Sequence, residues 1–288
     1  MTVLEALNGS TRVLKDYQVD NPRLNAELLL ARSLGIQRED LYIRLHSQVN
    51  EGEQEALEAF VQRRVSGEPL QYILGHQEFW SFDVNVTPQV LIPRPETELL
   101  VEQAISILEP TSFTKPALVL ELGTGSGAVA ISLAREVKEI FIVATDVWEE
   151  ALDVARQNAV RAAVEPKIVF VCGDLFDALQ GSKEKGPFNV IVSNPPYVPR
   201  PDIASLAREV RHEPRMALDG GEDGLDFHRR IISQAPAFLQ AGGWLLLEMG
   251  QGQGASVSAL IEEQVDFLRP QILSDLSGIE RVVKVQRR

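Results

Sequence analysis

The sequence predicts an α/β fold with a mostly parallel, doubly wound sheet, preceded by a small N-terminal helical domain and a connecting β-hairpin. Three observations predict this fold. After Pro116, apolar runs that suit strands alternate with segments of helical periodicity, which is typical of βαβ units and a parallel sheet. Residues 1–77 show only helical spacing of their apolar side chains, and residues 79–92 alternate with a period close to two.

Residues 1–77 are expected to form a helical domain of their own. Apolar side chains recur at helical spacing near the N-terminus, over residues 26–34 and over residues 53–65. The second of these stripes ends near Gly35 and the third is stopped by Gly67, as glycine commonly ends a helix. Because no strand pattern interrupts the stripes, the segment predicts a small helical bundle.

Residues 78–110 are expected to form a hairpin and a linker helix. The side chains from Phe79 to Val86 alternate, Pro88 begins a turn, and residues 90–92 resume the apolar pattern. A helix is then expected to begin at Pro95, because proline suits the first helical position and the glutamates beside it favour the positive end of the helix dipole.

Residues 111–288 are expected to form the α/β domain. Strands are predicted at residues 117–122, 140–145, 167–172, 188–193 and 243–248, and helices near residues 126–136, 149–162, 228–240 and 253–264. The alternating residues 281–285 predict a last strand at the edge of the sheet. Residues 181–186 predict an exposed loop.

Composition narrows the classes of function. The 288-residue chain carries a net charge of −13, which argues against a protein that binds nucleic acid directly. Its one cysteine, Cys172, cannot form an internal disulfide and is expected to be buried in a strand. The N-terminus lacks the positive start and long apolar core that are typical of a signal peptide, and no apolar stretch approaches the roughly 18 residues that span a membrane. We therefore expect a cytoplasmic protein without a membrane partner and, since its four histidines show no ligand spacing, without a metal.

A glycine-rich turn ends the first predicted strand and leads directly into a helix. Glycines there let the backbone turn tightly and approach a ligand that a Cβ would block. The arrangement predicts a nucleotide site, although the same spacing also satisfies a dinucleotide fingerprint. The residues expected to contact the cofactor here are Glu121, Gly123, Thr124, Gly125, Ser126 and Gly127.

Acidic residues end the next two predicted strands. Asp146, followed by Val147, is placed where a carboxylate accepts both ribose hydroxyls, and it could also cap the helix that follows. Asp174 can accept the adenine amino group while Leu175 covers the ring. Asp146 does not separate NAD from S-adenosylmethionine, because both have a ribose. Glu121 does favour S-adenosylmethionine, because a carboxylate tolerates the cationic methionine head group but repels a pyrophosphate.

The turn Asn194-Pro195-Pro196-Tyr197 follows the buried strand predicted at residues 188–193. Ligands bind at the carboxyl ends of strands in open α/β sheets. The side-chain oxygen of Asn194 and the rigidly placed carbonyl oxygen of Pro195 can each accept one N–H of an incoming –NH2 group. The nitrogen lone pair then faces a sulfonium methyl group. The ring of Tyr197 is expected to stack on the planar acceptor, and Asn194 is also expected to contact the cofactor.

These motifs and their flanking segments resemble the HemK/PrmC family of peptide chain release factor glutamine N5-methyltransferases. The flanking segments are residues 67–75 (GEPLQYILG), 91–98 (LIPRPETE) and 213–225 (EPRMALDGGEDGL). The resemblance covers essentially the whole chain and implies a class I (Rossmann-like) S-adenosylmethionine-dependent methyltransferase. At position 175, some members carry a larger aromatic residue in place of this leucine.

The resemblance also implies the substrate. Family members methylate the side-chain amide of the glutamine in the Gly-Gly-Gln motif of class I release factors. It implies that the helical domain binds the release factor, and that the target loop enters a cleft between the domains. Asn194, Pro195, Pro196, Tyr197, Arg94 and Glu96 are the residues expected to contact the substrate.

Other functions remain open from the sequence. A sister enzyme that methylates a glutamine of a ribosomal protein would share the fold and the turn. An adenine-N6 methyltransferase of DNA or RNA could use the same turn, but the net charge of −13 argues against it. An NAD-dependent oxidoreductase would leave the turn that begins at Asn194 unexplained, and a catalytically silent adaptor would not need it.

Overall fold

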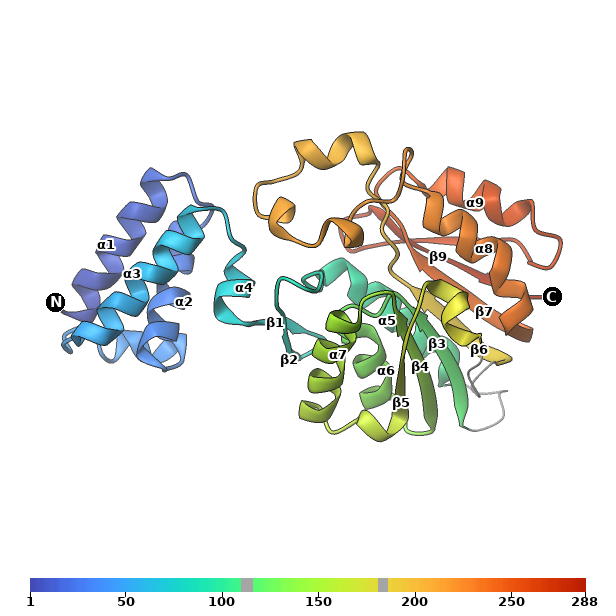
Figure 1. The fold of residues 1–288 in the computed structure, drawn as a ribbon, viewed down its shortest axis with the longest axis horizontal. Helices are drawn as coiled ribbons and strands as arrows, with labels where there is room; N and C mark the ends of the chain where they lie inside the picture. The colour runs from blue at the N-terminus through green and yellow to red at the C-terminus, as the bar shows by residue number, and fades with distance from the viewer. Residues whose placement is uncertain (110–115, 181–185) are drawn as a thin grey trace. The chain divides into compact units, whose positions relative to one another are not determined.

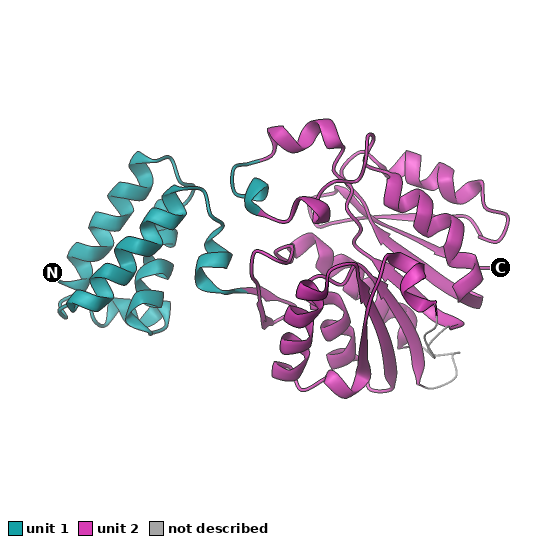
Figure 2. Cartoon of the chain, in the orientation of Figure 1, with its two compact units in different colours: residues 1–76, 207–212 teal, residues 77–206, 213–288 magenta. Residues whose placement is uncertain are grey.

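The computed structural model describes residues 1–109, 116–180 and 186–288. These residues form two compact units, coloured separately in Figure 2. The first comprises Met1–His76 with Ala207–His212, and the second comprises Gln77–Leu206 with Glu213–Arg288. The expected boundary between residues 110 and 111 lies outside the described residues, as does the expected loop at residues 181–186 apart from the exposed Gly186.

The first unit is the predicted helical bundle. Its helices are α1 (Val3–Asp16), α2 (Pro22–Leu34), α3 (Glu51–Val65) and α4 (Leu70–Leu74), with a 3-10 turn at Arg38–Tyr42 (Figure 1). Both α1 and α3 begin with a capping box, in which a polar residue and a glutamate three positions later bond each other's backbone N–H. The apolar faces of the helices share one core.

The segment Ala207–His212 packs onto this bundle through two side chains. Arg64 on α3 is almost fully buried, and its guanidinium pairs with the carboxylate of Glu209. Gly67 has a φ of +95°, and a Cβ there would lie 2.6 Å from the Arg208 side chain. The glycine that stops α3 therefore also lets Arg208 cross close to the backbone.

The hairpin is shorter than predicted and its turn lies elsewhere. Strands β1 (His76–Phe79) and β2 (Phe82–Asn85) flank the hairpin turn at Trp80 and Ser81, so the expected strand at residues 90–92 is wrong. The expected turn at Pro88 is present, closed by a hydrogen bond from the Val90 N–H to the Thr87 carbonyl at 3.1 Å, but it is not the turn of the hairpin. Trp80 and Ser81 both have positive φ values, 48° and 57°, as a two-residue hairpin turn requires. The usual glycine and asparagine signal for that turn is missing.

The second unit is built on a seven-stranded sheet with the strand order β5-β4-β3-β6-β7-β9-β8. The strands are β3 (Ala117–Leu122), β4 (Ile140–Asp146), β5 (Ile168–Cys172), β6 (Phe188–Ser193), β7 (Leu239–Glu248), β8 (Gln271–Ser274) and β9 (Glu280–Gln286). Strands β3 to β7 are parallel, which confirms the predicted sheet. The order runs outward in both directions from β3 and β6, and this switch point is where α/β sheets bind ligands.

The last strand was predicted at the wrong place in the sheet. β9 pairs antiparallel with both β7 and β8, so it lies inside the sheet rather than at its edge. The edge strand β8 was missed because its side chains are exposed or half-buried and show no apolar alternation. Cys172 also differs from its prediction, since it ends the other edge strand, β5, and is exposed.

Helices cover both faces of the sheet, as the doubly wound prediction requires (Figure 1). They are α5 (Glu98–Leu108), α6 (Ala128–Glu136), α7 (Glu149–Arg161), α8 (Asp226–Phe238) and α9 (Gly254–Glu262). Alternate residues of one strand enter opposite cores: Val190 and Val192 pack with α5 and α6, and Ile191 packs with α8 and α9. A 3-10 turn with proline in its first turn precedes α5, at Pro95–Thr97. Among the described residues, no helix has the length and apolar character needed to cross a membrane.

Candidate active site

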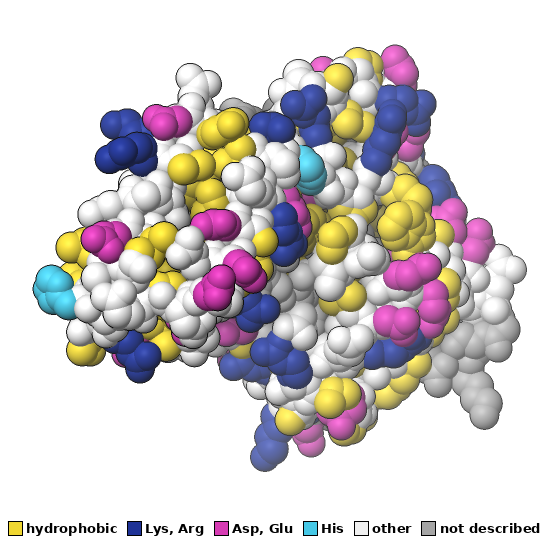
Figure 3. Space-filling view, turned by 60° about the vertical axis from the view of Figure 1, so that its left-hand side comes forward, with side chains coloured by type: hydrophobic (Ala, Val, Ile, Leu, Met, Phe, Trp, Pro, Cys, Tyr) yellow, Lys and Arg dark blue, Asp and Glu magenta, His cyan; other side chains and the backbone are white. Residues whose placement is uncertain are grey.

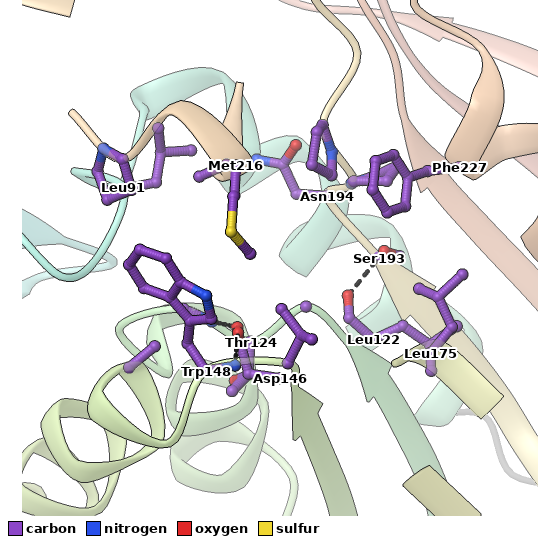
Figure 4. Close-up of a pocket in the computed structure, with 18 of the residues that line it drawn as sticks. Leu91, Leu122, Thr124, Asp146, Trp148, Leu175, Ser193, Asn194, Met216 and Phe227 are labelled. Carbon is purple, nitrogen blue, oxygen red and sulfur yellow. Dashed lines mark hydrogen bonds between the residues drawn. The ribbon is translucent and has the colours of Figure 1, made fainter. Parts of the chain in front are cut away.

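A pocket of about 740 Å³ lies at the carboxyl ends of β3, β4, β5 and β6 (Figure 4). The residues that line it all belong to the second unit. Most of the predicted site residues line this pocket: Glu121, Gly123, Thr124, Gly125, Ser126, Asp146, Val147, Asp174, Leu175, Asn194, Pro195 and Pro196. Gly127, Tyr197, Arg94 and Glu96 do not line it. The turn of residues 194–197, which is predicted to hold the methyl acceptor, is called the acceptor turn below. The fold therefore brings the predicted cofactor residues and part of the acceptor turn to one cavity.

The glycine-rich turn between β3 and α6 forms an open cradle. Gly123 and Gly125 have φ values of +72° and +53°, and a Cβ on either residue would meet no atom within 4 Å. Both residues line the pocket, so their backbones are free to approach a ligand there. Gly127 has a different part, because its Cβ would lie 3.1 Å from that of Ala155 on α7. This third glycine lets α6 and α7 pack closely.

Asp146 ties the glycine turn to the loop after β4. One carboxylate oxygen accepts a hydrogen bond from the Gly125 N–H at 2.8 Å, and the other accepts one from the Trp148 N–H at 3.1 Å. Burial raises the pKa of Asp146, and these backbone hydrogen bonds oppose the shift. The carboxylate is held in place at the pocket wall, and the ribose contact stays a prediction.

Replacing Asp146 with alanine is expected to weaken S-adenosylmethionine binding by about 10- to 100-fold, because hydrogen bonds to a charged group contribute about 1.5–3 kcal/mol. Isothermal titration calorimetry measures this affinity directly. Asp153→Ala is the matched control, since Asp153 is exposed on α7 and pairs with Arg156. Unchanged affinity in Asp146→Ala would reject the ribose role.

Glu121 is a buried carboxyl group at the end of β3. Its Oε2 accepts hydrogen bonds from the Thr124 hydroxyl at 2.7 Å and from the Ala130 N–H at 3.1 Å. Burial raises the pKa of Glu121 to about 8, and the nearby charge of Asp146 adds to the rise. A cation bound in the pocket would stabilise the carboxylate form, which suits the positively charged methionine head group predicted for this position.

The end of β5 brings two further predicted residues to the pocket. Asp174 pairs with Arg230 of α8 at 2.7 Å. Leu175 is buried and has a φ of +50°, in the left-handed region. Phe227, also on α8, lines the pocket with them (Figure 4). The two α8 residues were missed from the sequence because they fall within a helix and belong to no recognised motif.

Side chains on three loops line the opposite part of the cavity. Trp148, Leu91 and Met216 point into it in Figure 4. They come from loops that are far apart in the sequence, so no motif or residue spacing predicted that they would line one pocket. Their apolar surfaces give the pocket a side suited to the non-polar parts of a ligand.

The Asn194 turn is fixed from both sides. The Ser193 hydroxyl donates to the Leu122 carbonyl at 2.7 Å, which joins the ends of β6 and β3. The Asn194 Nδ2 donates to Thr97 Oγ1 at 3.2 Å. Tyr197 is mostly turned inward: its hydroxyl donates a long hydrogen bond to Glu248 at 3.4 Å, and burial raises its pKa. Its stacking on the acceptor stays a prediction.

The glycines of residues 220–224 pack on the backbone of this turn. The Gly220 N–H donates to the Val198 carbonyl at 2.9 Å. A Cβ on Gly220 would lie 2.8 Å from the Pro196 carbonyl oxygen, and one on Gly224 would lie 2.3 Å from the Tyr197 carbonyl oxygen. These positions require glycine because two backbone segments meet there. The segment therefore supports the acceptor turn.

Arg94 and Glu96 form ion pairs within the second unit. Arg94 pairs with the buried Glu213, whose other oxygen accepts a hydrogen bond from the Ile92 N–H at 3.0 Å. Glu96 lies 4.0 Å from Arg281. The Glu213 contacts join two loops that line the pocket. The predicted substrate contacts of Arg94 and Glu96 stay predictions.

Comparison with known proteins assigns the family. The PrmC N-terminal domain model matches residues 5–75, and a methyltransferase domain model matches residues 119–213. The release factor glutamine methyltransferase of Geobacter sulfurreducens is 40% identical over 283 residues, which cover 98% of this chain and 95% of that protein. That of Coxiella burnetii is 42% identical over 268 residues, 92% of each chain. The chain belongs to the release factor glutamine methyltransferase family.

Solved structures share the fold of this methyltransferase. The hMettl16 catalytic domain, solved with the MAT2A 3′UTR hairpin 6, matches with a TM-score of 0.58 at 14% identity, over 76% of this chain and 82% of that one. A methyltransferase from Pyrococcus furiosus matches with a TM-score of 0.50 at 18% identity, over 80% and 96%. The predicted methyltransferase fold is confirmed, and S-adenosylmethionine is the methyl donor.

Proposed function

We propose that this methyltransferase transfers the methyl group of S-adenosylmethionine to the side-chain nitrogen N5 of the glutamine in the Gly-Gly-Gln motif of class I release factors. One observation carries the proposal: Asn194 and Pro195 line the same cavity as the open glycine cradle. An acceptor amide held by that turn therefore shares the cavity with a donor held by the cradle. The names of relatives about 40% identical over nearly the whole chain support the choice of substrate.

The residues around the cavity fit the donor. The open side of Gly123 and Gly125 leaves room for a ligand to approach the protein backbone. Asp146 and Glu121 line the same cavity, and we assign Asp146 to the ribose and Glu121 to the cationic head group. When bound, S-adenosylmethionine supplies an electrophilic methyl group whose bond to sulfur breaks with its electron pair left on sulfur. No group of three or more acidic, histidine or cysteine side chains suited to a metal occurs in the described parts of the chain.

The acceptor nitrogen is activated by orientation. A carboxamide nitrogen is a poor nucleophile because its lone pair is delocalised onto the carbonyl. If Asn194 Oδ1 and the Pro195 carbonyl each accept one of its N–H groups, the lone pair points at the methyl carbon. With the donor bound, the new N–C bond would form in line with the S–C bond that breaks, and the nitrogen would then lose one proton to water. Fixing this geometry is worth several orders of magnitude in rate.

The helical domain, residues 1–77, is the proposed recognition module for the release factor. The hairpin and linker helix of residues 78–110 then connect it to the methyltransferase domain of residues 111–288. Residues 5–75 match a family model of their own. The consecutive residues Tyr42 and Ile43 of this unit are both exposed, and contiguous exposed apolar surface commonly marks an interaction site.

A protein substrate suits the surface better than a nucleic acid. On the face drawn in Figure 3, Lys and Arg side chains lie scattered among Asp and Glu side chains. Nucleic-acid binding depends on a concentrated basic surface, and the net charge of this chain is −13. A ribosomal protein glutamine would fit the same turn, and the test below separates it.

The test is methyl transfer to defined acceptors. Purified protein is incubated with labelled S-adenosylmethionine and, separately, a class I release factor, ribosomal proteins, RNA and DNA. We expect label on the release factor, mapped by mass spectrometry to the glutamine of its Gly-Gly-Gln motif. A release factor with that glutamine replaced by alanine is the matched control. Label on ribosomal protein or nucleic acid but not on the release factor would overturn the proposal.

A further inference from the structure

A buried carboxyl group lies beside the acceptor turn without a part in the reaction described so far. Glu248 ends β7, next to the end of β6, and is 1% exposed. Its Oε1 accepts the hydrogen bond from the Tyr197 hydroxyl. Its Oε2 has no hydrogen-bond partner among the described residues. A buried carboxyl oxygen left free costs stability, so its position suggests a use.

Thr97 links this carboxyl group to Asn194. It is 4% exposed, lines the pocket and accepts the hydrogen bond from Asn194 Nδ2. A hydroxyl that accepts one hydrogen bond still has its own proton to donate. The Thr97 hydroxyl lies near the Glu248 carboxyl group, whose pKa it lowers against the effect of burial. Its proton and the free Oε2 of Glu248 are therefore a matching donor and acceptor.

The direction of these hydrogen bonds decides which end of the Asn194 amide faces the cavity. The oxygen and the –NH2 of an asparagine amide have nearly the same shape, so partners rather than packing select the orientation. A threonine hydroxyl can accept from Nδ2 or donate to Oδ1. An ionised Glu248 can only accept. When its free Oε2 takes the Thr97 proton, Oγ1 is left as an acceptor for Nδ2, which is the role that Oγ1 has in the structure.

We propose that Glu248, acting through the Thr97 hydroxyl, holds the Asn194 amide with its oxygen toward the methyl acceptor. Glu248 and Thr97 are then positioning residues for the transfer. The inference rests on the proposed function, because it explains how the amide oxygen becomes available to an acceptor N–H. An amide turned the other way would present –NH2 to the acceptor –NH2 and could not orient its lone pair.

The arrangement makes the transfer rate depend on pH. The pKa of Glu248 is raised to about 7, mainly by burial and to a lesser degree by the nearby charge of Glu96, against the lowering effects of Thr97, Arg281 of β9 and Tyr197. On the α8 side, His228 Nε2 meets the Glu248 backbone carbonyl at 2.9 Å, and burial lowers the pKa of that histidine. Below about pH 7, protonated Glu248 can donate to Thr97, which frees Thr97 to donate to Asn194 Oδ1. The kcat is therefore expected to rise with pH through this range.

The first test removes the hydroxyl without changing the side-chain shape. In Thr97→Val we expect kcat to fall by about 10- to 100-fold, the scale of a misplaced catalytic group. The affinity for S-adenosylmethionine, measured by calorimetry, should stay unchanged. Thr97→Ser is the conservative variant and should restore most of kcat, because it restores the hydroxyl.

The second test removes the ionisation. In Glu248→Gln, kcat at saturating substrates should lose its rise through about pH 7, whereas the exposed acid variant Glu262→Gln should keep it. The side-chain ¹⁵N–¹H signals of Asn194 should shift between acidic and neutral pH in the unmodified protein and not in Glu248→Gln. This NMR measurement needs no turnover and no Thr97 variant.

Several results would overturn the inference. These are a normal kcat in Thr97→Val, an equal loss in Thr97→Val and Thr97→Ser, a loss of cofactor affinity that matches the loss of rate, or a pH-dependent Asn194 signal that persists in Glu248→Gln. Failure of the proposed function is distinct, because the unmodified protein would then leave the release factor unlabelled.

Discussion

Replacing Asn194 with alanine is expected to reduce kcat by about 100- to 1000-fold, the loss commonly seen when one group of a preorganised polar site is removed. The variant loses one of the two oxygens that orient the acceptor nitrogen, whereas the glycine cradle and Asp146 remain. Cofactor affinity should therefore change little. Single-turnover transfer from labelled S-adenosylmethionine measures the rate, and calorimetry measures the affinity.

Asn194→Asp is the informative companion to this variant. It keeps an oxygen at the same position but lacks the Nδ2 that donates to Thr97, so its kcat should lie between those of the alanine variant and the unmodified protein. Transfer at the normal rate in Asn194→Ala would show that the two-acceptor geometry is wrong.

The sheet and its ligand edge could be predicted because the information is local. Strands such as β3 and β6 are short buried apolar runs, and each is followed directly by the residues that line the cavity. Parallel strands bring their carboxyl ends together. Residues as far apart in the sequence as Gly123 and Asn194 were therefore expected at one edge.

Features that depend on tertiary packing could not be predicted in the same way. Trp80 and Ser81 of the hairpin turn have positive φ values, and neither residue type is typical of that conformation. Strand β8 has a largely exposed face and so lacks an apolar pattern. Thr97 was taken as part of a helix start, and its contact with Asn194 became visible only when the two elements were placed in space.

Gly224 packs directly against the backbone of Tyr197, a role that the sequence pattern alone did not explain. Its replacement is expected to be strongly destabilising. Gly224→Ala should lower the free energy of unfolding by about 3 kcal/mol or more. A left-handed φ costs an L-residue roughly 1–2 kcal/mol, and overpacking adds about 1–3 kcal/mol. Here φ is +78° and the new Cβ would lie 2.3 Å from the Tyr197 carbonyl oxygen.

The matched control separates the two causes. Gly252 has a similar φ of +83°, but a Cβ there meets nothing within 4 Å, so Gly252→Ala should cost only the conformational term of about 1–2 kcal/mol. Urea denaturation of both variants measures the difference.

The Tyr197 carbonyl also accepts a hydrogen bond from Gln253 at 3.0 Å, so it has little freedom to move away from the new methyl group. The folded fraction of Gly224→Ala should accordingly transfer methyl groups more slowly, because the displaced carbonyl belongs to the acceptor turn. Equal destabilisation in the two variants would mean that the contact between this glycine and the turn contributes nothing.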